Sequence, residues 1–267
     1  MGSVIKVNGL IKQLGNNEAV AGIDFSVEQG EVFGLLGPNG AGKTTTIRVL
    51  TTLLPPTAGS VQIDGFDVVK HASAVRQRIG YVPQALSAVG MLTGFENLLI
   101  TAKLLRLPKA EREQRIEEVL DLLNLREAAS KLVSQYSGGM VRRLEIGLAI
   151  LHRPKVLILD EPTVGLDPIA RRTIWEVFDQ LRSETEMTVL ITTHYMEEAE
   201  VTCQRLAIMS KGRIVAHGTP EELKARLDNP DATIEDVFAH FAGGQFVESG
   251  GSYRDTRRLR KRMQRYN

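Results

Sequence analysis

The spacing of apolar and polar positions changes several times along the chain. In the first 65 residues, β-branched and aromatic residues form short runs separated by glycine, a pattern that predicts strands. These predicted strands cover residues 4–10, 22–28, 31–37 and 59–65. Between the last two, residues 42–54 have a helical pattern that Pro55 and Pro56 close.

From about residue 91 to residue 150 the pattern becomes helical, and apolar residues recur at helical spacing over residues 110–125. Continuous apolar runs at 156–160 and 188–194 are typical of buried parallel strands, and a helical segment, 170–184, lies between them. Residues 206–218 predict a hairpin that turns at Lys211 and Gly212. A short helix capped by Thr219 follows. This alternation predicts an α/β fold with a helical insertion.

Composition is ordinary for a soluble globular protein, and the length fits one large domain or two small ones. The chain has 267 residues, of which 43% are hydrophobic and 24% are charged, so disordered, collagen-like and disulfide-scaffold designs are excluded. A single cysteine, Cys203, cannot form an intrachain disulfide, and we expect it to be a small buried residue. The chain has no run of 18 apolar residues and no apolar signal core at its start. We therefore expect a protein that neither spans a membrane by itself nor is exported.

The net charge of +1 conceals a strongly basic end. Residues 254–267 contain seven basic residues and one acid, so the rest of the chain is acidic, which disfavours nucleic acid as a partner. In this tail Leu259, Met263 and Tyr266 fall on one face of a predicted helix. A Gly-rich linker, 243–252, precedes it. Three interpretations stay open, namely a solvated tail, docking on a partner subunit, and contact with anionic lipid.

Residues 37–44 match the phosphate-binding pattern G-x-x-x-x-G-K-[ST], after a predicted strand and before a helix. Glycines let the backbone N–H groups turn toward phosphate oxygens, and the helix N-terminus adds positive potential. Lys43 reaches the β- and γ-phosphates, and the Thr44 hydroxyl can ligate Mg²⁺. A chance glycine turn would lack this order of elements. The residues predicted to contact nucleotide here are Gly37, Pro38, Asn39, Gly40, Ala41, Gly42, Lys43, Thr44 and Thr45.

Two carboxylates end the apolar run at 156–160. Asp160 stands where a carboxylate can hold the Mg²⁺ shell of a nucleotide, and Glu161 can polarise the attacking water. The plainer interpretation is a strand that ends in two solvated acids. Because the same chain also has a phosphate loop, the nucleotide interpretation is favoured.

A phosphate loop and an acidic strand end occur in many nucleotide hydrolases, and the segment SGGM narrows the choice among them. This segment starts at Ser137 and opens a predicted helix 23 residues before Asp160. With it, the chain resembles the ATP-binding subunit of an ABC (ATP-binding cassette) transporter over about residues 4–240. Gln84 matches the family's Q-loop, Gly165-Leu166-Asp167 its D-loop, and His194 its switch histidine. The resemblance implies a P-loop ATPase core with a mostly parallel sheet, an antiparallel β subdomain and an inserted helical subdomain. It divides the chain into an ATP-binding core (1–85 and 151–240), a helical signature subdomain (86–150) and a linker with a basic tail (241–267).

The resemblance also implies roles and partners. Glu161 would be the base, and His194 would contact the γ-phosphate and help hold the attacking water. Gln84 would sense that water and the Mg²⁺, which Thr44 and Asp160 would ligate. Two cassettes would pair head to tail, so that the signature of one closes over the ATP of the other. The residues expected to close over that ATP are Ser137, Gly138, Gly139 and Asp167. A separate membrane-spanning permease subunit would dock on the face bearing Gln84, at the cytoplasmic side of the cell membrane.

Two departures from the family pattern refine this expectation. Met140 replaces the usual glutamine of the signature and is followed by Arg142 and Arg143, which resembles the drug-resistance and type-2 exporter subgroup. Leu14 stands where the family usually has an aromatic ring against adenine. We therefore expect export rather than import, and modest discrimination between ATP and GTP.

Two rival functions are a non-transport ATPase of this family that acts on nucleic acid or ribosomes, and a regulatory subunit without catalysis. A single cassette with an acidic body disfavours the first, and Glu161 with His194 disfavours the second. Trp175 and Phe178 are expected in the core. The other four histidines are expected to be structural or solvated. They are His71, His152, His217 and His240.

Overall fold

The computed structural model describes residues 2–227 and 229–242. The predicted basic tail helix and the Gly-rich linker before it, 243–252, lie outside these residues. The first sheet is antiparallel, with the strand order β2-β1-β4-β5. Its strands are β1 (Ser3–Leu14), β2 (Asn17–Glu28), β4 (Ala58–Ile63) and β5 (Phe66–Asp67). Alternate positions of β1, such as Ile5 and Val7, are buried on the face that meets the rest of the protein.

The second sheet has the order β10-β9-β3-β8-β7-β6, and only β10 runs antiparallel to its neighbour. Its strands are β3 (Val32–Leu36), β6 (Ile79–Val82), β7 (Val156–Asp160), β8 (Thr188–Thr193), β9 (Arg205–Ser210) and β10 (Arg213–Gly218). Every residue of β3, β7 and β8 is buried. Continuous apolar runs suit such strands because both faces of the sheet are covered.

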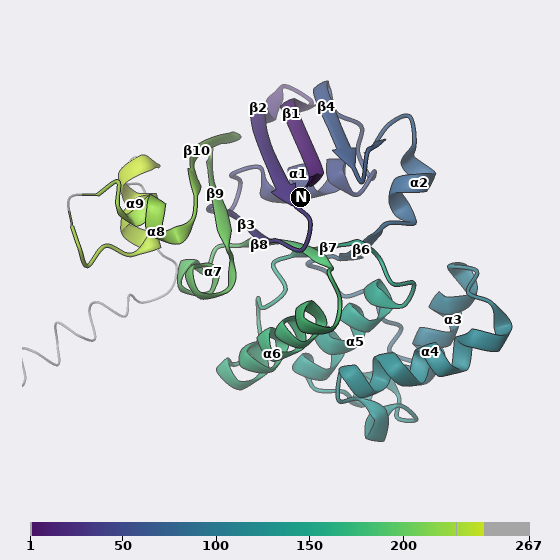
Figure 1. Cartoon of the computed structure of the whole chain (residues 1–267). Coiled ribbons are helices and arrows are strands. Elements are labelled where there is room, and N and C mark those ends of the chain that lie inside the picture. The colour runs from purple at the N-terminus through teal and green to yellow at the C-terminus, as the bar shows by residue number, and fades with distance from the viewer. Residues whose placement is uncertain (1, 228, 243–267) are drawn as a thin grey trace, which may run out of the picture.

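Helix α1 (Lys43–Leu50) lies between the two sheets (Figure 1). Its Ile47 and Leu50 pack in one hydrophobic cluster with Ile5 of the first sheet and Leu35 of the second. This three-layer packing fixes the start of α1 against the end of β3. The loop that joins them, residues 37–42, is therefore held at both ends.

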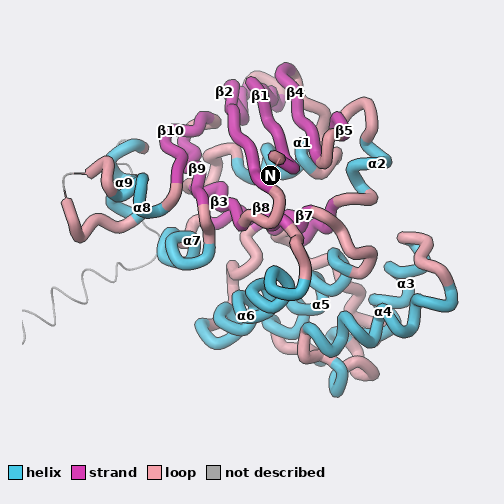
Figure 2. Tube along the Cα trace, in the orientation of Figure 1, coloured by secondary structure: helices cyan, strands magenta, loops and turns pink. Residues whose placement is uncertain are grey.

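Helices α5 (Gly138–Ile150) and α6 (Pro168–Glu184) cover the opposite face of the second sheet, with α3 (Gly94–Leu104) and α4 (Lys109–Leu122) beyond them (Figure 2). The remaining helices are α2 (Ala72–Arg76), α7 (Met196–Thr202), α8 (Pro220–Lys224) and α9 (Ile234–Phe241). Two 3₁₀ turns, Arg126–Ala128 and Val133–Gln135, link α4 to α5. In the described part of the chain, no helix is both long and apolar enough to cross a membrane.

The α/β fold with a mostly parallel sheet and a separate antiparallel sheet is confirmed. The hairpin prediction is also confirmed, since Lys211 and Gly212 both have positive φ between β9 and β10. Thr219 caps α8 in a capping box, as expected. The helix predicted over 42–54 is too long, because α1 ends at Leu50 and Thr52 takes a left-handed φ of 62°.

Several residues expected in the core are found there. Phe178 is buried, and Trp175, which is half-buried, packs edge-to-face against it with ring centroids 5.5 Å apart. Cys203 is buried as expected, and burial raises the pKa of its thiol to about 12, so the sulfur stays protonated. His152 makes a hydrogen bond with the Ile79 carbonyl. The other three of these histidines are exposed, namely His71, His217 and His240.

Gly80 of β6 gives a test of the packing between this strand and α5. A Cβ at this position would lie 2.4 Å from the Ala149 carbonyl oxygen, a backbone atom that cannot turn away. We expect Gly80→Ala to lower the free energy of unfolding by about 1–3 kcal/mol, the usual cost of overpacking. Chemical denaturation measures it.

Gly90→Ala is the matched control. Its added Cβ would meet only the Ser134 atoms 3.8–3.9 Å away, which is ordinary contact. We expect this variant to be neutral or slightly stabilised. Equal stability of the two variants would contradict the close approach of β6 and α5.

Candidate functional site

The predicted site residues gather at the carboxyl ends of the parallel strands. β3 leads into the phosphate loop, β6 into Gln84, β7 ends at Asp160, and β8 ends directly before His194. Carboxyl ends of neighbouring parallel strands meet at one edge of a sheet, which is where open α/β sheets bind ligands. Four segments far apart in sequence therefore meet at one edge.

The phosphate loop closes tightly around Lys43. Gly42 has a φ of 106°, and a Cβ there would lie 2.5 Å from the Ala19 carbonyl oxygen, so only glycine fits. The Lys43 ammonium is buried and donates to the carbonyls of Gly37, at 2.7 Å, and Pro38, at 3.2 Å. The loop thus curls around its own lysine.

Glu161 lies at the centre of the predicted catalytic residues, because Lys43, Gln84 and His194 all approach its carboxylate. Its Oε1 lies 3.2 Å from Lys43 Nζ and 3.4 Å from His194 Nδ1, and its Oε2 accepts from Gln84 Nε2 at 3.4 Å. Glu161 is only 5% exposed. The structure therefore brings together the four residues that the sequence predicted to be catalytic.

The backbone at Glu161 is strained in a specific way. Its φ of 51° is left-handed, which is uncommon for a residue with a side chain. The conformation is held by β8, because the Glu161 amide donates to the carbonyl of Thr192 at 3.1 Å and to its hydroxyl at 3.0 Å. This turn lets consecutive carboxylates contact different groups, since Asp160 meets Thr44 and Glu161 meets Lys43.

The oxygens of Thr44 and Asp160 form a pair that fits Mg²⁺. Thr44 Oγ1 lies 3.3 Å from Asp160 Oδ1, which also accepts from Thr192 Oγ1 at 2.6 Å. Mg²⁺ prefers oxygen ligands and commonly takes one or two from the protein and the rest from water and phosphate. In the described part of the chain, no group of three or more His, Cys, Asp or Glu side chains could form a metal cage.

A pocket of about 220 Å³ lies over the phosphate loop. It is lined by the loop itself, by Gln84 and Glu161, and by Leu14, Asn17 and Ala19 from the β1–β2 hairpin. Leu14 is 42% exposed there. The residue that replaces the expected aromatic ring therefore shares the pocket with the predicted phosphate ligands.

The signature serine lies elsewhere. Ser137 is exposed and caps α5, accepting from the Met140 amide at 3.3 Å. Asp167 caps α6 and accepts from the amides of Ile169 and Ala170 at 2.9 Å each. Among the described residues that line the pocket over the phosphate loop, none comes from 137–139 or 165–167. The residues predicted to contact nucleotide thus lie at two separate places on the chain.

Arg171 is a residue that sequence reasoning missed. Its Nε donates to the Leu166 carbonyl at 3.0 Å, and its guanidinium stacks 4.3 Å from the Tyr195 ring centroid. The Arg171 guanidinium also lies 3.6 Å from the Glu198 carboxylate, which accepts a hydrogen bond from the Thr163 hydroxyl. Burial raises the pKa of Glu198. This network ties the segment before α6 to the segment after His194. An arginine four residues past Asp167 was the only signal in the sequence.

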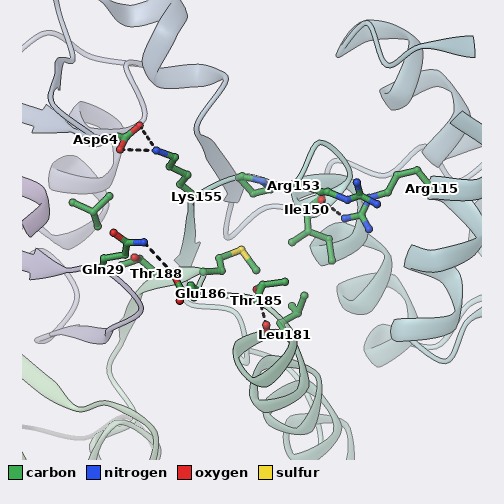
Figure 3. A pocket seen from close by; sticks show the side chains of 13 residues that line it. Gln29, Asp64, Arg115, Ile150, Arg153, Lys155, Leu181, Thr185, Glu186 and Thr188 are labelled. Carbon is green, nitrogen blue, oxygen red and sulfur yellow. Dashed lines mark hydrogen bonds and ion pairs between the residues drawn. The ribbon is translucent and has the colours of Figure 1, made fainter. Parts of the chain in front are cut away.

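A larger pocket, of about 300 Å³, lies near the start of β7 and β8, at the opposite end of these strands from the phosphate loop (Figure 3). Its polar groups pair with one another, since Lys155 contacts Asp64 at 2.9 Å and Gln29 contacts Glu186 at 3.3 Å. The described residues that line it include none of the predicted nucleotide ligands. Its size therefore does not make it the candidate site.

Comparison with known sequences places this site in context. The pattern of the ABC transporter family matches residues 20–164. The chain is 43% identical over 224 residues to the linearmycin resistance ATP-binding protein LnrL of Bacillus subtilis, covering 84% of this chain and 72% of that protein. It is 44% identical to the daunorubicin resistance ATP-binding protein DrrA3 of Streptomyces coeruleorubidus (84% and 70%) and to the Nod factor export ATP-binding protein I of Ralstonia nicotianae (82% and 68%).

Solved structures of ATP-binding cassettes superpose on this chain. The ATP-binding subunit of an ABC transporter superposes with a TM-score of 0.80 at 28% identity, over 90% of this chain and 99% of that one. A dimeric ATP-binding cassette in a post-hydrolysis state, bound to ADP and Pi, superposes with a TM-score of 0.72 at 25% identity, over 80% and 98%.

Leu14→Tyr tests whether this hairpin position faces the base. A ring there would add stacking, and base–aromatic contacts in nucleic-acid binding are worth roughly 1–3 kcal/mol per base. We expect the variant to bind ATP more tightly in an equilibrium titration, and the wild-type chain to discriminate only modestly between ATP and GTP. Leu53→Tyr is the control, because Leu53 is exposed away from the pocket. Unchanged affinity in Leu14→Tyr would mean that another side chain meets the base.

Proposed function

This chain belongs to the ABC transporter family as an ATP-hydrolysing subunit, and we propose that it powers export through a separate membrane subunit. Its relatives are named for resistance to linearmycin and daunorubicin and for Nod factor export. These names favour transport over a role on nucleic acid. They also favour outward transport, as the Met140 variant of the signature does.

The observation that carries the proposal is the cluster of side chains around the buried Glu161. A carboxylate with Lys43, Gln84 and His194 within 3.2–3.4 Å stands beside a phosphate loop and an Asp–Thr oxygen pair. A chain that only bound nucleotide would need the loop but not this set of contacts. The cluster supports the hydrolysis of ATP by water, which gives ADP and phosphate.

The chemistry follows from positions in the cluster. Lys43, now held between loop carbonyls and Glu161, would turn to the β- and γ-phosphates and neutralise charge that develops on the transferring group. Glu161, released from the lysine, would accept the proton of the attacking water. His194 would contact the γ-phosphate, and Gln84 would orient the water. Mg²⁺, held by Thr44 and Asp160, would supply further charge stabilisation when bound.

The separation of the two half-sites supports a head-to-tail dimer. Ser137, at a helix N-terminus, offers a hydroxyl and backbone donors to an anion, yet it is exposed away from its own phosphate loop. Two-fold symmetry would bring Ser137, Gly138, Gly139 and Asp167 of each chain over the ATP of the other. A related cassette is a dimer in its ADP- and Pi-bound state.

An apolar groove supports the permease contact. A hollow of about 410 Å³ is lined by Ser87, three residues after Gln84, and by the apolar side chains of Val89, Ile100 and Leu104, of which Leu104 is 78% exposed. Exposed apolar surface of this kind marks a protein interface. Docking there would place the chain at the cytoplasmic face of the cell membrane, with Gln84 next to the contact.

Glu161→Gln tests the proposed base. The substitution keeps the size of the side chain but removes its basicity, and general-base catalysis contributes on the order of 10²–10⁴-fold. We expect ATP hydrolysis to fall by about that factor while ATP binding survives and an ATP-locked dimer accumulates in size-exclusion chromatography. Turnover near that of the wild type would exclude Glu161 as the base.

Mixing two inactive variants tests the shared site. Ser137→Arg places bulk and charge where the opposite ATP must dock, and Lys43→Ala removes a phosphate partner. Each alone should hydrolyse little ATP. Their mixture contains heterodimers with one intact and one doubly damaged site, so activity should partly recover. Full activity of Ser137→Arg as a strict monomer would overturn the dimer.

A further inference from the structure

Helix α5 buries two charged side chains against the segment that carries Gln84. Arg142 is 3% exposed and Glu145 is 2% exposed, and they lie three residues apart on one side of the helix. Charged groups are rarely buried this far unless they are paired. Their hydrogen-bond partners show which segments these two side chains hold.

Arg142 holds backbone carbonyls from two different strand ends. It donates to the Pro83 carbonyl at 2.8 Å, to the Gln84 carbonyl at 3.4 Å and to the Glu161 carbonyl at 3.3 Å. Burial lowers the pKa of its guanidinium, which shows the cost of keeping the charge there. The flat fork of donors on arginine can span several acceptors at once, and no other side chain offers this.

Glu145 holds the far end of the same segment. Its Oε1 accepts from the amides of Ser87 and Ala88, each at 2.6 Å, and its Oε2 accepts from the Ser87 hydroxyl at 2.6 Å. The segment 83–88 is therefore attached to α5 at both ends. Gln84 lies within it, and its side chain reaches Glu161.

This attachment connects the signature to the catalytic carboxylate. Ser137 caps α5, and Arg142 follows five residues later, about 7.5 Å along a rigid helix. A shift of the signature end of α5 must carry Pro83, Gln84 and Glu161 with it, or break the bonds of Arg142. The contact with the opposite ATP and the position of the attacking water are thereby mechanically joined.

We propose that Arg142 and Glu145 form a positioning pair that sets Gln84 and Glu161 according to the position of the signature helix. The proposal rests on the ATPase function proposed above. It adds residues that touch neither nucleotide nor water but act through two residues that do. A displacement of about 1 Å in a positioned group can cost on the order of 10²-fold in rate.

Arg142→Met against Arg143→Met is the decisive comparison. Arg143 is the next residue, but it donates to the carbonyls of Leu123 and Asn124 at the end of α4. We expect Arg142→Met to lower kcat for ATP by about 10- to 100-fold, with KM within about twofold of the wild-type value, because the phosphate loop is untouched. Arg142→Lys, which keeps the charge but not the fork, should fall between. Arg143→Met should keep kcat near that of the wild type.

Two further readouts separate positioning from general damage. If Arg142 acts through Gln84, the combined loss in Gln84→Ala with Arg142→Met must be smaller than the product of the two single losses. Amide hydrogen exchange over residues 83–88 should speed up in Arg142→Met and in Glu145→Ala, but not in Arg143→Met. A kcat for Arg142→Met equal to that of Arg143→Met, or fully multiplicative losses, would overturn the proposal.

The exchange measurement does not depend on catalysis. A wild-type chain that bound ATP without hydrolysing it would refute the proposed function. Even then, faster exchange over 83–88 in Arg142→Met and Glu145→Ala would support the attachment of this segment to α5. Unchanged exchange in these two variants would refute the attachment.

Discussion

The buried contact between Lys43 and Glu161 is the interaction on which the site depends. Two opposite charges, both nearly inaccessible to water, lie 3.2 Å apart between the phosphate loop and the end of β7. Burying either charge alone is costly, because an unpaired ion loses its hydration. Here each group compensates the charge of the other. The carboxylate proposed as the base is therefore held by the lysine of the phosphate loop.

Parallel strand pairing makes that contact possible. β7 pairs with β8 in register, so Asp160 lies beside Thr192, and the hydroxyl and carbonyl of Thr192 hold the left-handed turn at Glu161. The continuous apolar runs of β3, β7 and β8 are needed because both faces of the sheet are packed. The same core that stabilises the fold thus fixes the carboxylates, with little freedom left at the strand ends.

Helix α5 extends this arrangement beyond the pocket. One end carries the exposed Ser137, and the next turns carry Arg142 and Glu145, which hold the segment 83–88. On the other side, Arg171 joins the Leu166 carbonyl to the Tyr195 ring beside His194. The segments that would meet a second chain are therefore each bonded to a segment that meets the proposed catalytic carboxylate.

The sequence by itself determined the fold class, the phosphate loop, the strand ends that carry Asp160 and His194, and the capped helix at Thr219, because these rest on local spacing and backbone preferences. It did not predict β6, whose four residues are too few for a periodic signal, nor the early end of α1 at Leu50. The grouping of Lys43, Gln84, Glu161 and His194 was expected from family resemblance, but their contacts and the strained turn at Glu161 were not. The contacts that Arg142, Glu145 and Arg171 make were not predicted from the sequence. The bonds of Arg142 and Glu145 to the segment 83–88 join residues 57 to 59 positions apart, so they depend on how α5 packs against β6, and only the tertiary structure decides that.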